Sequence, residues 1–67
     1  LRKQANAIKR LEEKIADLDD QSSALEEEIA LPENASNSDK LMELTAQKAH
    51  IDEILLDLYD QWETLSE

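Results

Sequence analysis

The fold is decided at residues 31–39, which read LPENASNSD and hold the only proline of the chain. Proline disfavours helical geometry in the residue before it and clashes with the preceding turn, so a helix should end near Leu31. Residues 33–38 are polar and rich in Asn and Ser, as loops are. Asp39 suits the first turn of a second helix, with one of the three residues before it as N-cap. The sequence predicts one helix over about residues 2–30, a loop over about 31–38 and a second helix over about 39–66.

Apolar residues recur in steps of three and four on both sides of this loop. A seam that repeats every seven residues stays on one side of a helix only if that helix supercoils against a partner. Because the loop is short, the two helices are each other's nearest partner. The chain is therefore predicted to be all-α, a two-helix antiparallel coiled-coil hairpin that forms one domain over residues 1–67. The residues expected in the seam are Leu1, Ile8, Leu11, Ile15, Leu18, Leu25, Ile29, Leu41, Leu44, Ile51, Leu55, Leu58, Trp62 and Leu65.

Two alignments of the helices satisfy both the loop length and the heptads. In the first alignment Ile15 faces Ile51 and Leu1 faces Leu65. In the second alignment, which is shifted by one heptad, Ile29 faces Leu44. We expect the first.

Polar residues interrupt both seams, namely Gln4 and Ser22 on the first helix and Lys48 on the second. One interpretation is that they fix the alignment and keep further helices from joining, at some cost in stability. The other is that they form a soft spot that allows the helices to slip by one heptad. We favour the first interpretation.

The composition argues against chemistry within this chain. Sixty-seven residues without cysteine form at most one small domain, for which long helix packing is the remaining source of stability. The absence of glycine rules out a phosphate-binding loop of the G-x-x-x-x-G-K type. His50 is the only histidine and falls on the outer face of the second helix. We expect a non-catalytic domain with no catalytic, cofactor-binding or metal-binding residue.

The net charge of −10 is distributed unevenly along the chain. Residues 1–14 hold five bases and two acids, whereas residues 15–67 hold two bases and fifteen acids. Basic side chains bind nucleic acids by displacing counterions from phosphates. The candidates for such contacts are Arg2, Lys3, Lys9 and Arg10. The remaining, strongly acidic part of the rod would repel a duplex, so binding to DNA or RNA is kept as an alternative.

A second, milder apolar stripe lies on one shoulder of the second helix. Its members are Met42, Thr45, Ala49, Leu56 and Tyr59. Scattered surface apolar residues are ordinary in soluble proteins and need no function. The other interpretation is that Met42, Leu56 and Tyr59 dock on another domain or on a second copy of the hairpin.

The chain gives no indication of a membrane span or of secretion. No apolar run approaches the roughly 20 residues that a spanning helix needs. No secretory signal is present, and the lack of cysteine agrees with a reducing compartment. We expect a cytoplasmic protein.

Three segments resemble the C-terminal coiled-coil domain of ABC-F ATPases, which are soluble twin-cassette ABC proteins with Uup-like and translation-associated members. These segments are RLEEKIADL at residues 10–18, KLMEL at residues 40–44 and LYDQWETL at residues 58–65. The resemblance implies a hairpin that follows the second ATPase cassette of a parent protein. It carries over the seam residues Leu11, Ile15, Leu18, Leu55, Leu58, Trp62 and Leu65, and no ATP-binding residue.

The same resemblance implies a function for the parent protein. ABC-F proteins hydrolyse ATP and act on ribosomes, and in the Uup-like branch this domain is associated with DNA binding. We expect a monomeric accessory arm that contacts the ribosome, nucleic acid or the parent ATPase cassettes, with ATP as the parent's cofactor. One alternative is a stand-alone structural coiled coil for homodimerisation. A second alternative is a DNA-binding arm as in Uup-like members.

Overall fold

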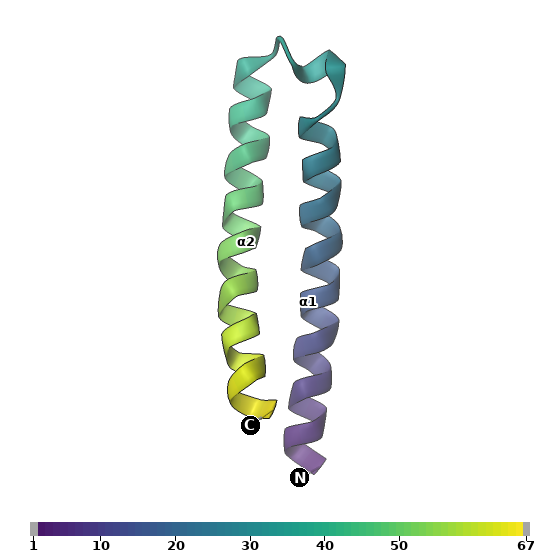
Figure 1. The fold of residues 1–67 in the computed structure, drawn as a ribbon, viewed down its shortest axis with the longest axis vertical. Helices are drawn as coiled ribbons and strands as arrows, with labels where there is room; N and C mark the ends of the chain where they lie inside the picture. Colours follow the sequence, from purple (N-terminus) through teal and green to yellow (C-terminus); the bar gives the residue numbers. More distant parts are fainter. Residues whose placement is uncertain (1, 67) are drawn as a thin grey trace.

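The computed structural model describes the backbone of residues 2–66 and the side chains of residues 4–66. Its two long helices are α1 (Arg2–Ile29) and α2 (Ser38–Ser66), and a short 3₁₀ helix, η1 (Pro32–Asn34), lies between them. The helices run antiparallel side by side, so that the start of α1 and the end of α2 lie at the same end of the rod (Figure 1). The molecule measures 52 × 14 × 12 Å along its principal axes. This confirms the predicted all-α antiparallel hairpin.

The helix bounds lie within one residue of those predicted. Both helices lack internal glycine and proline, so the backbone hydrogen bonds run unbroken for 28 residues in α1 and 29 residues in α2. Helices of this length gain most of their stability from packing of the apolar stripe. Neither helix of the described residues has an apolar stretch long enough to cross a lipid bilayer.

The loop reverses the chain without any glycine. Leu31 is extended, with φ −62° and ψ 131°, as the proline after it demands. The 3₁₀ helix η1 then turns the chain, and no residue of the described backbone has a positive φ. The Asn34 side chain is 3% exposed, and its Nδ2 donates a hydrogen bond of 2.8 Å to the carbonyl of Glu28. Asn34 therefore provides a hydrogen-bond donor for a carbonyl in the last turn of α1. In helices that end with glycine, a backbone N–H at or after the left-handed glycine usually fills this role.

The start of α2 is capped by Asn37. The backbone N–H of Lys40 donates to Asn37 Oδ1 at 3.2 Å, which satisfies one of the N–H groups that lack a partner within the first turn. Asp39 adds a negative charge at the positive end of the helix dipole.

The apolar seam forms the core between the helices. Its most buried side chains are Leu11, Ile15, Leu44, Leu55 and Leu58. Half-buried side chains extend the seam in both directions, and these are Ile8, Leu18, Leu25, Ile29, Leu41, Ile51, Trp62 and Leu65. Leu1 lies outside the described residues. Burying one such side chain contributes about 1.5–3 kcal/mol, so this single layer of pairs carries the stability of the rod.

The alignment that we expected from the sequence is wrong, and the helices take the alignment shifted by one heptad. Ser22 Oγ donates a hydrogen bond of 2.9 Å to Asp52 Oδ1. The expected alignment places Ser22 level with Leu44, eight residues or about 12 Å along the axis from Asp52, which a serine cannot reach. Trp62 Nε1 donates a hydrogen bond of 3.3 Å to Glu12 Oε2, and this contact agrees with the same shift. Ile29 therefore lies level with Leu44, and Ile15 lies level with Leu58 instead of Ile51.

Two physical reasons favour the shifted alignment. Both alignments set Ser22 and Lys48 against apolar residues, but only the shifted one brings Asp52 within reach of Ser22, so that Asp52 bonds to both polar side chains. In addition, η1 packs against α2, so the loop occupies space beyond the end of α1. As a result α2 extends past the level of Ile29 by six residues, or about 9 Å.

Disulfide cross-linking tests this alignment, because the natural chain has no cysteine. The pair Ile15→Cys with Leu58→Cys is level in the observed alignment and should oxidise to an intramolecular disulfide in nearly all molecules. The matched pair Ile15→Cys with Ile51→Cys is level only in the other alignment and should stay reduced, since its Cβ atoms lie too far apart. Preferential cross-linking of the second pair, measured by mass spectrometry, would contradict the observed alignment.

Two adjacent leucines test where the stability resides. Leu55 is 6% exposed and Leu56 is 72% exposed. Leu55→Ala should lower the free energy of unfolding by about 2–4 kcal/mol because it leaves a cavity in the seam. Leu56→Ala should change it by less than about 0.5 kcal/mol, as surface substitutions do. Urea unfolding followed by circular dichroism measures both, and equal losses would show that the seam does not carry the stability.

Candidate functional site

A polar clamp sits in the middle of the apolar seam. Asp52 Oδ2 accepts a hydrogen bond of 2.8 Å from Lys48 Nζ, while Asp52 Oδ1 accepts the bond from Ser22. Ser22 is 7% exposed, so its hydroxyl needs a partner in this place. Since Ser22 belongs to α1 and the other two residues to α2, a slip by one heptad would break the bond between the helices. We therefore interpret these polar residues as fixing the alignment.

The clamp shifts the pKa of both charged groups. The hydrogen bond from Lys48, followed by the bond from Ser22, holds the pKa of Asp52 below its ordinary value. The hydrogen bond to Asp52 raises the pKa of Lys48. Both shifts favour the charged forms, so the folded hairpin keeps the ion pair over a wider pH range than the unfolded chain.

Acid titration tests the clamp. Because folding lowers the pKa of Asp52, its contribution is complete above the unfolded pKa, near 3.9, and disappears as the pH falls through the folded pKa. The thermal midpoint of Asp52→Asn should therefore fall less than that of the natural chain between about pH 6 and about pH 2. Glu53→Gln removes a neighbouring exposed carboxylate and serves as the control, which should follow the natural chain. Identical acid dependence of the Asp52→Asn variant and the natural chain would contradict a stabilising role of the Asp52 charge.

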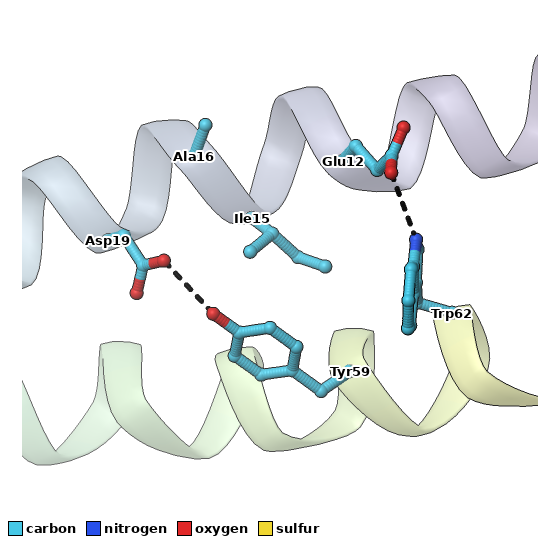
Figure 2. Close-up of a pocket in the computed structure, with 6 residues that line it drawn as sticks. All are labelled: Glu12, Ile15, Ala16, Asp19, Tyr59 and Trp62. Atoms are coloured by element: carbon cyan, nitrogen blue, oxygen red, sulfur yellow. Dashed lines mark hydrogen bonds between the residues drawn. The ribbon is translucent and has the colours of Figure 1, made fainter.

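A shallow groove with a volume of about 300 Å³ lies between α1 and α2, toward the open end of the hairpin. Its lining residues are Glu12, Ile15, Ala16, Asp19, Tyr59 and Trp62. Figure 2 shows the two aromatic side chains of α2 pointing toward α1, on either side of Ile15. We call this site the aromatic groove.

Each aromatic ring of the groove is held by one carboxylate of α1. Trp62 Nε1 donates to Glu12 Oε2 at 3.3 Å, and Tyr59 OH donates to Asp19 Oδ2 at 3.0 Å (Figure 2). The bond to Asp19 raises the pKa of the Tyr59 hydroxyl, because it stabilises the protonated phenol beside a negative charge. The small side chain of Ala16 leaves the space between the rings open.

The predicted docking residues do not form one patch. Met42 is 71% exposed, Leu56 is 72% exposed and Tyr59 is 44% exposed. Met42 and Leu56 are fourteen residues apart on one face of α2, or about 21 Å along its axis. Leu56 and Tyr59, three residues apart, do adjoin. The structure therefore joins Tyr59 to the aromatic groove, with Leu56 beside it and Met42 remote.

The predicted nucleic-acid contacts are only partly described. The side chains of Arg2 and Lys3 lie outside the described residues, whereas Lys9 and Arg10 are exposed on α1. The alignment brings Lys9 and Arg10 level with the acidic last turns of α2. The two bases of α2 lie in the half nearer the loop, where they approach Glu28 and Asp52. The helices therefore do not combine their bases into one positive surface.

Sequence reasoning missed three residues that organise these sites. Glu12 and Asp19 were not singled out from the sequence, and Asn34 was expected only as part of a polar loop. One indication was available for Glu12, because a half-buried tryptophan N–H usually finds a hydrogen-bond partner. Identifying that partner required the correct helix alignment. Among the described side chains, no group of His, Asp or Glu residues is arranged to hold a metal ion.

Comparison with known families agrees with this architecture. The family of the ABC transporter C-terminal domain matches residues 1–67, which is the full length of the chain. The chain belongs to this family. No curated protein and no solved structure matches it. As an ABC transporter C-terminal domain, the hairpin is an accessory domain of an ABC protein. The match confirms that the chain is the C-terminal domain of an ABC protein. Its assignment to the ABC-F branch is a proposal.

Proposed function

We propose that this ABC transporter C-terminal domain is a non-catalytic interaction arm of an ABC-F ATPase, either Uup-like or translation-associated. In this proposal the parent's cassettes bind and hydrolyse ATP in the cytoplasm. The hairpin contacts the ribosome, nucleic acid or those cassettes. The family match over residues 1–67 is the observation that carries the proposal, and the LYDQWETL segment at residues 58–65 supports the narrower branch.

The shape of the hairpin supports a role in reach and contact. A rod 52 Å long can hold a binding surface far from the point where it joins its parent. Two grooves between the described parts of its helices have volumes of about 300 and 270 Å³, at or below the small end of ligand-binding pockets. Surfaces of this kind suit contact with a macromolecule better than enclosure of a substrate.

The seam supports a monomeric arm over a stand-alone dimer. Leu11 and Ile15 of α1 form one buried cluster with Leu55 and Leu58 of α2 within a single chain. A second copy would find no comparable unpaired seam on the described surface. A net charge of −10 also makes two copies repel each other.

Removal of the hairpin from the parent protein tests the proposed arm. Basal ATP hydrolysis should stay within about twofold, while the affinity for ribosomes should fall at least about tenfold, or about 1.4 kcal/mol. Co-sedimentation with ribosomes and a phosphate-release assay measure these two properties. If removal of the hairpin changes neither ribosome binding nor the rate of ATP hydrolysis in the presence of ribosomes, the proposal is contradicted.

The double variant Leu56→Glu with Tyr59→Glu tests whether α2 makes the contact. Because both side chains are exposed, the hairpin should remain folded by circular dichroism while partner binding is lost. Ala46→Glu with His50→Glu adds the same two negative charges at other exposed positions of α2 and should leave partner binding unchanged. Equal binding by the first variant and the natural chain would show that the contact is made elsewhere.

A further inference from the structure

We infer that the aromatic groove binds one arginine or lysine side chain of a basic protein segment. The inference deepens the proposed function and rests on the hairpin being an interaction arm. It names the partner chemistry and the residues that recognise it. Its basis is the juxtaposition of two aromatic rings from α2 with two carboxylates from α1 around an open hollow.

The four polar and aromatic groups of the groove provide complementary contacts for a cation. The faces of Tyr and Trp rings attract ammonium and guanidinium groups. Glu12 and Asp19 each accept a hydrogen bond from a ring, and a carboxylate retains further acceptor sites after one such bond. A planar guanidinium forms strong, charge-assisted hydrogen bonds with carboxylates.

The dimensions of the groove suit a single long side chain. Glu12 and Asp19 are seven residues apart on α1, which corresponds to about 10 Å along the helix axis. The volume between them is about 300 Å³. Leu56, 72% exposed and adjoining Tyr59, extends the groove with an apolar edge. The aliphatic stem of a lysine or arginine can lie along such an edge while its charged head reaches one of the two carboxylates.

The charge around the groove selects a basic protein segment as its occupant. One helical turn away from the lining residues lie three further acids, Glu13, Asp20 and Glu63, and one base, Lys9. Residues 15–67 together hold fifteen acids and two bases. This field attracts a cationic segment and accelerates its association. It repels the phosphates of DNA and RNA, so a nucleic acid does not fit the groove.

The seam explains how the groove stays open without a ligand. Ile15 at its floor is buried in the core cluster, and Trp62 packs against that cluster. The hydrogen bonds to Glu12 and Asp19 hold the rings in place. A site held in its binding geometry loses less conformational entropy when a ligand enters.

A pair of matched variants tests the groove in the 67-residue chain. Glu12→Gln with Asp19→Asn removes both groove charges while nearly preserving side-chain shape. Glu13→Gln with Asp20→Asn removes two exposed charges at the adjacent positions, on the outer face of α1. Both variants carry the same net charge. The probe is an arginine-rich peptide, and binding is followed by calorimetry and by the fluorescence of Trp62, the only tryptophan.

The expected result is a difference between the two variants. The groove variant should bind the peptide at least about tenfold more weakly than the natural chain, and the outer-face variant should stay within about threefold at the same salt concentration. The Trp62 fluorescence of the natural chain should change on binding. Equal losses in both variants would show that only the overall charge attracts the peptide, and would overturn the inference.

Four further outcomes also decide the matter. Tyr59→Phe keeps the ring and removes its hydroxyl, so retained binding supports recognition by the ring face. Competition for the groove by a DNA or RNA oligonucleotide would overturn the choice of a basic protein partner. Self-association that depends on Glu12 and Asp19, without peptide binding, would instead make the occupant the basic first turns of a second copy.

The parent protein separates the groove from the proposed arm. If removal of the hairpin abolishes ribosome binding but the groove variant of the parent still binds, the groove is overturned and the proposed arm stays intact.

Discussion

The hydrogen bond between Ser22 and Asp52 determines in which of two nearly equivalent alignments the hairpin folds. Apolar heptads pair α1 with α2 in either alignment, because a shift by seven residues replaces one leucine or isoleucine with another. The polar residues break this equivalence. In the observed alignment Lys48 and Ser22 bond to the two oxygens of one carboxylate, so a buried hydroxyl and a charge within the seam are both satisfied. The positions of every groove and exposed patch follow from that choice.

The fold class and the limits of the helices could be predicted from the sequence, whereas the alignment could not. Heptad spacing and Pro32 were enough to predict two helices and a reversal of the chain. Besides the bond between Ser22 and Asp52, the observed alignment depends on η1, whose turn and Asn34 cap place the loop beyond the end of α1. That geometry results from several weak hydrogen bonds that composition alone does not reveal. Pairing of apolar residues was therefore an insufficient guide to the alignment.

The candidate site was harder to predict than the fold for the same reason. Tyr59 and Trp62 were recognised from the sequence, one as a docking residue and the other as a seam residue. Their partners Glu12 and Asp19 lie on the other helix, and only the correct alignment brings them within hydrogen-bond distance. A shift of one heptad moves a residue by about 10 Å relative to the opposite helix. The aromatic groove is thus a product of the alignment that the polar clamp fixes.

The most direct test of this account is a methyl nuclear Overhauser spectrum of the labelled hairpin. Ile15 lies level with Leu58, and Ile51 lies seven residues further toward the start of α2, about 10 Å away. The account predicts a strong contact between the methyl groups of Ile15 and Leu58 and none between those of Ile15 and Ile51. A strong contact between Ile15 and Ile51 would contradict the alignment and, with it, the polar clamp and the aromatic groove.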